Sequence, residues 1–265
     1  MSSGFATFTE EHEAFRRTVR AFVEREILPN VNAWEEAEAF PRELYLKAAE
    51  QGFFGLKYDE KFGGSNAGYF YEAVLHEELS KCRSGGVAAG LGAQATIATG
   101  PLHLFGNDEL KQRFLAPAIR AEKIGAFGVT EPGAGSDVAG LQTTAKRDGD
   151  FYVVNGSKTY ITNGVVADYV IAAVKTDPSR GHKGLSMLVI EKGTPGFGVS
   201  KKLKKLGWRA SDTAELFFDD CRVPVKNLLG VENDGFAQVM GNFVWERITL
   251  ALGSVGAAQD ILELA

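Results

Sequence analysis

Apolar residues in the N-terminal part of the chain recur at helical spacing. The first run follows Thr9, a residue type that caps helices, and stops at Pro29. Its apolar positions are Phe15, Val19, Phe22, Val23 and Ile27. Further helices are predicted after Pro41 and over residues 67–81, 85–104 and 109–115. This pattern predicts an all-helical domain over residues 1–123.

The pattern changes near Gly125 to short runs rich in β-branched and aromatic residues. Turn signals separate these runs, and no long helix lies between them. Because a parallel sheet needs long crossover connections, the pattern favours a small antiparallel β-barrel over residues 124–231. The predicted strands are residues 125–130, 143–146, 151–161, 169–175, 186–191 and 215–223.

From Gly235 the apolar spacing is helical again, and it reaches Ala265 without a capping glycine or a proline. One apolar helix of this length cannot bury its apolar positions alone. We therefore interpret residues 232–265 as the first helix of a C-terminal helical domain that is truncated here. The predicted fold class is α+β, with an N-terminal helical domain, a middle antiparallel β-barrel and the start of a C-terminal helical bundle.

Composition and charge narrow the class of protein. The 265 residues are 45% hydrophobic and 24% charged, which is typical of a globular chain with about one or two domains. The formal net charge of −5 argues against nucleic-acid binding, which usually needs a basic face. The four histidines show no pair at metal-ligand spacing, so no metal site is expected.

One uncharged segment, residues 84–107, is long enough to span a membrane. It is rich in Gly and Ala and contains several polar residues, so we interpret it as a closely packed buried helix and expect no membrane insertion. Residues 1–9 lack the basic start and apolar core of a secretory leader, so none is expected, and Cys82 and Cys221 share no metal or redox spacing. These features favour a reducing compartment such as the cytoplasm.

Two segments contain groups suited to binding a cofactor. A glycine-rich bend follows the first predicted strand, and it could expose amide N–H groups to an anion or be an ordinary turn. The second segment, residues 154–164, has a predicted hairpin turn at Asn155-Gly156 and ends in Tyr160-Ile161-Thr162. An aromatic ring beside a hydroxyl could stack on a planar cofactor or form an ordinary cross-strand pair.

Adjacent charges at Glu246 and Arg247 interrupt the last apolar helix. Burying a charge in such a helix costs free energy unless the charge is paired or has a role in catalysis. Burial also raises the pKa of a carboxyl toward the range of a general base. An ordinary ion pair is the alternative.

Taken together and in this order, these segments resemble the acyl-CoA dehydrogenase flavoenzymes. The most specific matches are G-V-T-E-P-G-A-G-S-D at residues 128–137 and N-G-x-K-x-Y-I-T-N-G at residues 155–164. Looser matches are T-P-G-F at residues 194–197 and the segment 204–213. The resemblance covers nearly the whole chain, and it implies the same three-part fold.

The resemblance also implies an activity. In this family an acyl thioester loses a proton from Cα and a hydride from Cβ, and FAD accepts the hydride, which gives the trans-2-enoyl-CoA. The implied cofactor-binding residues are Phe127, Gly128, Val129, Thr130, Gly135, Ser136, Tyr160, Ile161 and Thr162. Many members have Trp at the position of Tyr160, and Tyr fills the pocket less.

The catalytic base differs between branches of the family. Most members take it from a late loop of the C-terminal bundle, beyond this chain. Isovaleryl- and long-chain-type members place a Glu directly before a substrate-contacting Arg, which implies Glu246 as the base here. The implied substrate contacts are Ser136, Val244 and Arg247. The uncharged helix over residues 85–104 is expected to line the acyl pocket.

The family further implies electron-transfer flavoprotein as the electron acceptor and a homo-oligomer, a dimer or a homotetramer. Because C-terminal residues bind the adenine half of FAD in the family, we expect the truncated chain to bind FAD weakly. Two alternatives stay open at this point. One is a flavin-dependent monooxygenase or oxidase on the same fold, and the other is a truncated, non-catalytic subunit.

Overall fold

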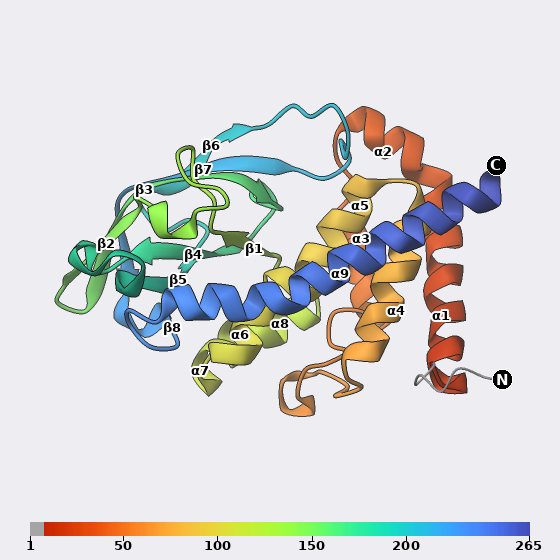
Figure 1. The fold of residues 1–265 in the computed structure, drawn as a ribbon, viewed down its shortest axis with the longest axis horizontal. Coiled ribbons are helices and arrows are strands. Elements are labelled where there is room, and N and C mark those ends of the chain that lie inside the picture. The colour runs from red at the N-terminus through yellow and green to blue at the C-terminus, as the bar shows by residue number, and fades with distance from the viewer. Residues whose placement is uncertain (1–7) are drawn as a thin grey trace.

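Helices make up the N-terminal half of the computed structural model, which describes residues 8–265 (Figure 1). Thr9 caps the first helix as predicted, because its Oγ1 accepts a hydrogen bond from His12 N and its own N–H donates to His12 Nδ1 at 3.0 Å. The helices before the sheet are α1 (Glu10–Phe22), α2 (Val31–Ala37), α3 (Glu43–Glu50), α4 (Tyr69–Leu79), α5 (Gly85–Gly92), α6 (Gly100–Phe105), α7 (Asp108–Leu110) and α8 (Ala116–Ile119).

The helix predicted over residues 85–104 is not continuous. A π-helical turn, Ala93–Ile97, follows α5, and the chain then bends before α6 begins at Gly100. Pro101 has no backbone N–H to donate to the preceding turn, which accounts for a new helix start at this point.

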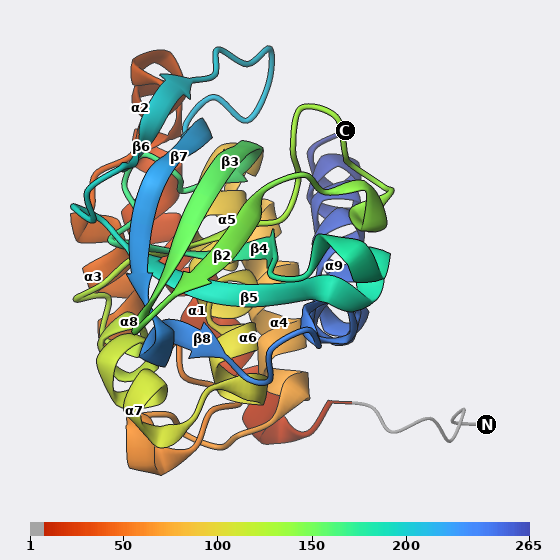
Figure 2. The same ribbon diagram turned by 90° about the vertical axis from the view of Figure 1, so that its left-hand side faces the viewer.

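An eight-stranded sheet follows the helices (Figure 2). Its strand order is β6-β7-β3-β2-β4-β5-β8, and β1 pairs with β4 outside this path. The strands are β1 (Gly125–Gly128), β2 (Thr144–Asp148), β3 (Phe151–Thr162), β4 (Tyr169–Lys175), β5 (Leu185–Glu191), β6 (Phe197–Lys202), β7 (Thr213–Pro224) and β8 (Leu228–Leu229).

The α+β fold class is confirmed, but the sheet is not the closed, wholly antiparallel barrel that the sequence predicted. The path ends at β6 and β8, which do not pair with each other, and β1 runs parallel to β4, as β2 also does at Thr144 and Lys175. The parallel β1–β4 pair is possible because the β2–β3 hairpin lies between β1 and β4 in the sequence and provides the long connection that parallel strands need.

The hairpin turn predicted at Asn155-Gly156 is wrong. Both residues lie inside β3, and the turn between β2 and β3 is made at Gly149, whose φ is +59°. The register of β3 against β7 shifts between Val154 and Gly156, which marks a β-bulge. Asn155 pairs there with Asp220, because its Oδ1 accepts from Asp220 N at 2.8 Å.

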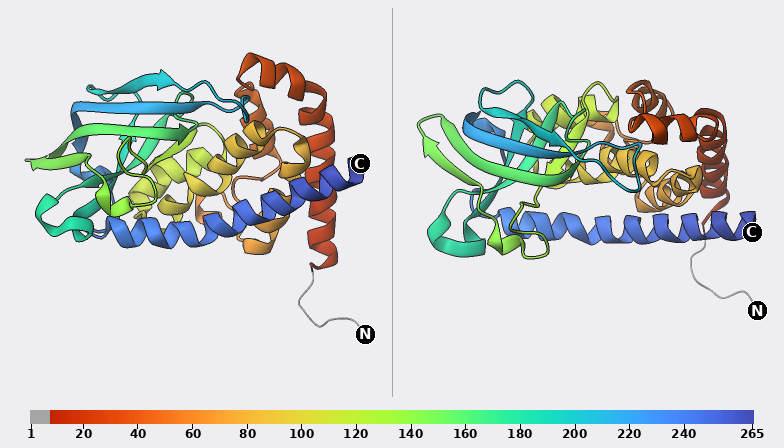
Figure 3. Two further views of the ribbon diagram at one scale, coloured as in Figure 1. Left: turned by 45° about the horizontal axis from the view of Figure 1, so that its top comes forward. Right: turned by 90° about the horizontal axis from the view of Figure 1, so that it is seen from above.

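The last helix, α9 (Gly235–Leu264), extends along both the sheet and the helical layer (Figure 3). It packs on α4, α6 and β5. Its opposite face exposes large apolar side chains, namely Val244, Ile248, Leu250, Val255, Ile261, Leu262 and Leu264. No helix within residues 8–265 combines the length and the apolar character that crossing a membrane requires.

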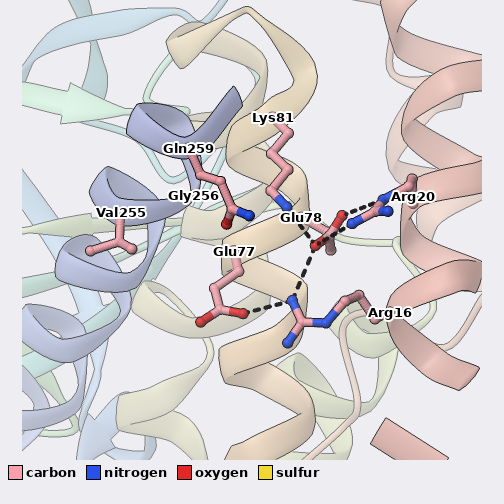
Figure 4. Close-up of a pocket in the computed structure, with 8 residues that line it drawn as sticks. All are labelled: Arg16, Arg20, Glu77, Glu78, Lys81, Val255, Gly256 and Gln259. Atoms are coloured by element: carbon pink, nitrogen blue, oxygen red, sulfur yellow. Dashed lines mark hydrogen bonds and ion pairs between the residues drawn. The ribbon is translucent and has the colours of Figure 1, made fainter. Parts of the chain in front are cut away.

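A charged cluster joins α1 to α4 beneath the C-terminal half of α9 (Figure 4). The Glu78 carboxylate is fully buried and accepts hydrogen bonds from Arg16, Arg20 and Lys81 at 2.9–3.2 Å. Arg16 also donates to Glu77 at 2.7 Å. Burial raises the pKa of Glu78, but its three cationic partners outweigh this effect and hold the pKa below its usual value.

Candidate active site

The two segments predicted to bind a cofactor lie side by side where β1 and β3 end. The bend after β1 is hydrogen-bonded to β3 twice, because Thr159 N donates to Thr130 O at 3.0 Å and Thr130 Oγ1 donates to Thr159 O at 2.5 Å. Residues 130–137 and 160–162, which are about 25–30 positions apart in the sequence, therefore border the same end of the sheet.

A buried ion pair fixes these two segments to each other. Lys158 Nζ donates to Glu131 Oε1 at 2.8 Å and to Val129 O at 3.1 Å, and the exposed fractions of the Lys158 and Glu131 side chains are 0% and 5%. The Glu131 carboxylate also accepts the backbone N–H groups of Gln142 and Thr143. Each charged group of the pair thus has at least two hydrogen-bond partners, which offsets part of the cost of burying the charges.

Burial lowers the pKa of Lys158 to about 8, against the opposing effect of Glu131. The pKa of Glu131 is raised by burial but held below its usual value by Lys158 and the hydrogen bonds. The sequence analysis missed this pair. The signal was available, because strand alternation places Lys158 on the same face as Val154, and a lysine on a buried face needs a partner.

The predicted cofactor residues divide into exposed and buried sets. Tyr160 is 70% exposed and has a left-handed backbone, with φ +59°. Gly135 and Ser136 are exposed, and open space surrounds the position that a Cβ would occupy at Gly135. Phe127, Thr130 and Thr162 are half-buried, whereas Gly128, Val129 and Ile161 are buried.

Glu246, the predicted base, points inward from α9. It is 8% exposed, and Asn242 Nδ2 donates to its Oε1 from one helical turn earlier. Burial raises the pKa of Glu246 to about 7, and Lys57 and then Arg247 oppose this rise. Val244 and Arg247 are exposed, and the Arg247 guanidinium lies 5.7 Å from the ring centroid of Phe243.

The helix that carries Glu246 touches the first cofactor segment through aromatic side chains. The rings of Phe127 and Phe243 meet edge to face, with centroids 6.3 Å apart. Phe243 lies three residues before Glu246, about one helical turn. No hydrogen bond within residues 8–265 joins the Glu246 side chain directly to the bend or to residues 160–162.

A cavity of about 350 Å³ opens between α4, α6 and α9. Its lining residues are Lys57, Tyr69, Gly100, His103, Leu104, Gly241, Asn242, Val244 and Trp245. Behind it, Lys57 Nζ donates to Glu72 Oε2 at 2.8 Å, and Thr96 Oγ1 donates to Glu72 Oε1 at 2.9 Å. The sequence analysis did not identify Lys57 or Glu72.

A metal-binding cluster of three or more His, Cys, Asp or Glu is absent from the part of the chain that the structure describes. Cys82 and Cys221 are both buried and free. Burial raises the pKa of each thiol to about 11, which makes them inert.

Comparisons with known proteins agree with this architecture. The model for the acyl-CoA dehydrogenase N-terminal domain matches residues 9–122, and the model for the middle domain of the same family matches residues 126–221. The chain therefore belongs to the acyl-CoA dehydrogenase family, as its two motifs predicted.

Individual relatives cover nearly the whole chain. The short-chain specific acyl-CoA dehydrogenase of Clostridium acetobutylicum is 41% identical over 95% of this chain and 66% of its own length. The crystal structure of acyl-CoA dehydrogenase from Geobacillus kaustophilus is 44% identical, with a TM-score of 0.93 over 97% of this chain and 68% of that one. The crystal structure of acyl-CoA dehydrogenase complexed with FAD from Bacillus anthracis is 33% identical, with a TM-score of 0.90. It matches 97% of this chain and 44% of that one. The chain thus spans about two thirds or less of the length of these relatives.

Proposed function

We propose that the complete protein is a flavin-dependent dehydrogenase that introduces an α,β double bond into an acyl-CoA thioester. The observation that carries the proposal is the meeting of the two family motifs at Thr130 and Thr159, beside a helix that holds the buried carboxylate of Glu246. The proposed domains are residues 1–123, 124–231 and 232–265.

The residues at the end of the sheet fit a flavin. An exposed aromatic ring at Tyr160 offers a stacking surface, and the open bend at Gly135 lets backbone amides approach a phosphate. Thr130 and Thr162 are half-buried residues of the same two segments. FAD, when bound, supplies the acceptor for the hydride that leaves Cβ of the substrate. Phe127 to Thr130 and residues 135–136 would hold it on one side, and residues 160–162 on the other.

Glu246 would accept the proton from Cα of the thioester. A base works best when its pKa lies near the working pH, and burial brings the pKa of Glu246 to about 7. The exposed Arg247, Val244 and Ser136 would contact the substrate. We further propose an electron-transfer flavoprotein as acceptor and a homo-oligomeric assembly, on the basis of family membership.

The proposal is tested by anaerobic reduction of the flavin in the complete protein with short, branched and long acyl-CoA thioesters. We expect Glu246→Gln to retain flavin colour and thioester binding while reduction slows by about 10²–10⁴-fold, since proton removal is obligatory. Glu263→Gln, on the exposed part of the same helix, is the matched control and should reduce normally.

Near-normal reduction of the Glu246→Gln protein would place the base beyond residue 265. The absence of reduction by every thioester would remove the dehydrogenase proposal. Rapid oxidation of the reduced flavin by oxygen with a hydroxylated product would indicate a monooxygenase instead.

A further inference from the structure

A buried ion pair next to Glu246 has no part in the chemistry described so far. The exposed fractions of the Lys57 and Glu72 side chains are 7% and 3%. Trp245, the residue before Glu246, donates its indole N–H to the same Glu72 oxygen that Lys57 binds. Three aromatic rings surround the ammonium group, with centroids 5.4–5.9 Å away, those of Tyr58, Tyr69 and Trp245. The ammonium is therefore held in one place from several sides.

One cavity is lined both by Lys57 and by residues of α9 next to Glu246, although Glu72 and Glu246 themselves do not line it. Lys57, Trp245 and Asn242 line it, and Asn242 is the residue whose amide holds the Glu246 carboxylate. Buried charges interact far more strongly than exposed ones, because water screens them less. The Lys57 ammonium is thus a fixed charge in a poorly screened space beside the base.

The other charged or titratable groups around Glu246 are few. Arg247 lies on the same helix but is exposed, so water screens its charge. His76 on α4 is buried, and burial together with Lys57 lowers its pKa to about 4, which leaves it neutral at neutral pH. Burial also lowers the pKa of His103 on α6. Glu72 on α4 is the partner of Lys57.

We propose that Lys57 is a positioning residue for the dehydrogenation, whose ammonium keeps Glu246 ionised enough to accept a proton, while Glu72 and Trp245 hold that ammonium in place. The inference rests on the proposed function, because it assigns Lys57 a role through Glu246. Lys57 does not touch the substrate's reacting atoms in this account.

The proposal makes predictions of opposite sign for the two members of the pair. Lys57→Met removes the positive charge beside Glu246, so the carboxyl should become harder to ionise. Glu72→Gln leaves the ammonium without its counter-charge, so the carboxyl should become easier to ionise. A purely structural role predicts a different result, because a loosened and hydrated cavity would move both variants toward the ordinary pKa of a carboxyl.

The test is a carbon-13 NMR titration of the complete protein without substrate, labelled at the Glu side-chain carboxyl carbons and assigned with Glu246→Gln. We expect Lys57→Met to raise the midpoint of Glu246 by about half a pH unit or more, and Glu72→Gln to lower it. Lys57→Arg should stay near the unaltered protein. Lys47→Met is the matched control, because Lys47 is 53% exposed and pairs with Glu26 at 2.6 Å, and it should leave the midpoint unchanged.

A midpoint that stays unchanged or falls in Lys57→Met would overturn the proposal. If that variant does not fold, Lys57→Gln carries the same expectation, because it removes the same positive charge while its side-chain amide can still donate to Glu72. The titration does not depend on catalysis, so a result that overturns the role of Lys57 would leave the proposed function intact. Normal flavin reduction by Glu246→Gln would instead remove the proposed base, whatever the titration shows.

Discussion

Glu246 is a single residue at which folding and function oppose each other. Its pKa is raised by burial to about 7, above the value of 4.5 for an exposed glutamic acid. Folding therefore favours the protonated form. This contribution to stability is fully present below about pH 4.5 and is lost as the pH rises through about 7. At a pH where Glu246 is charged and able to act as a base, its burial costs stability.

We predict that Glu246→Gln stabilises the protein only at the higher pH. At pH 8 the free energy of unfolding should rise by about 2 kcal/mol, because a neutral amide replaces a buried carboxylate. At about pH 4.5 the variant and the unaltered protein should differ little. Urea denaturation at both pH values measures this, with Glu263→Gln as the exposed control. An equal effect at both pH values would contradict the prediction.

The burial of a site residue could be predicted from the sequence where its neighbours along the chain also surround it in the fold. The apolar residues around Glu246 predicted a desolvated carboxyl, and the structure buries it. Its cationic neighbour Lys57 lies 189 positions earlier, in a segment without regular periodicity, so nothing local connects the two. Contacts of this kind depend on how the helices assemble, which periodicity does not encode.

Among the elements, the bend after β1 and the strand β3 depend on the Lys158–Glu131 pair. Lys158 donates to both Val129 O and the Glu131 carboxylate, and both side chains of the pair are buried. Removing one member leaves the other charged, buried and without its partner, which costs more than the pair itself contributes.

We predict that Lys158→Met lowers the free energy of unfolding by about 3 kcal/mol, because it leaves the Glu131 carboxylate buried without its cationic partner. Lys158→Met with Glu131→Gln should recover part of this loss, since no buried charge remains. Lys146→Met, on the exposed face of β2, should change stability little. Urea unfolding of the three proteins is the measurement. If Lys158→Met and the double variant are equally destabilised, the lost bond to Val129 O accounts for the effect and the prediction fails.

Element types were easier to predict than their ends and connections. The apolar spacing correctly gave helices before Gly125 and strands after it. The hairpin turn was misassigned because Asn-Gly is a strong turn signal, yet Gly149 already supplied the turn and Gly156 lies inside β3, opposite a bulge on β7. The interruption of the predicted helix at Ala93–Ile97 has no periodicity signal, since the segment is uncharged and four of its five residues are buried.

At the scale of the whole molecule, α9 connects the two layers, and the charged cluster at Glu78 connects α1 to α4 beneath it (Figures 3 and 4). The sequence predicted the order of layers but not the open path of the sheet. Whether a sheet closes depends on how its first and last strands meet, and no feature of a single strand decides that. The structure leaves β6 and β8 unpaired with each other.

The Glu78 cluster predicts how the assembled molecule responds to acid. The pKa of Glu78 is lower in the folded protein than its ordinary value of 4.5. The ionised Glu78 carboxylate therefore stabilises the fold above about pH 4.5, and this stabilisation is lost as the pH falls through the pKa of the folded state. We predict that Glu78→Gln lowers the free energy of unfolding by about 2 kcal/mol at pH 7, where three cations lose their shared counter-charge, and by much less at about pH 3. Urea unfolding across this range measures the difference. Glu13→Gln is the control, because Glu13 is 45% exposed and pairs with Arg16 at the surface, so its effect should be small at every pH. A loss from Glu78→Gln that is the same at both ends of the range would show that side-chain packing, and not charge, holds α1 against α4.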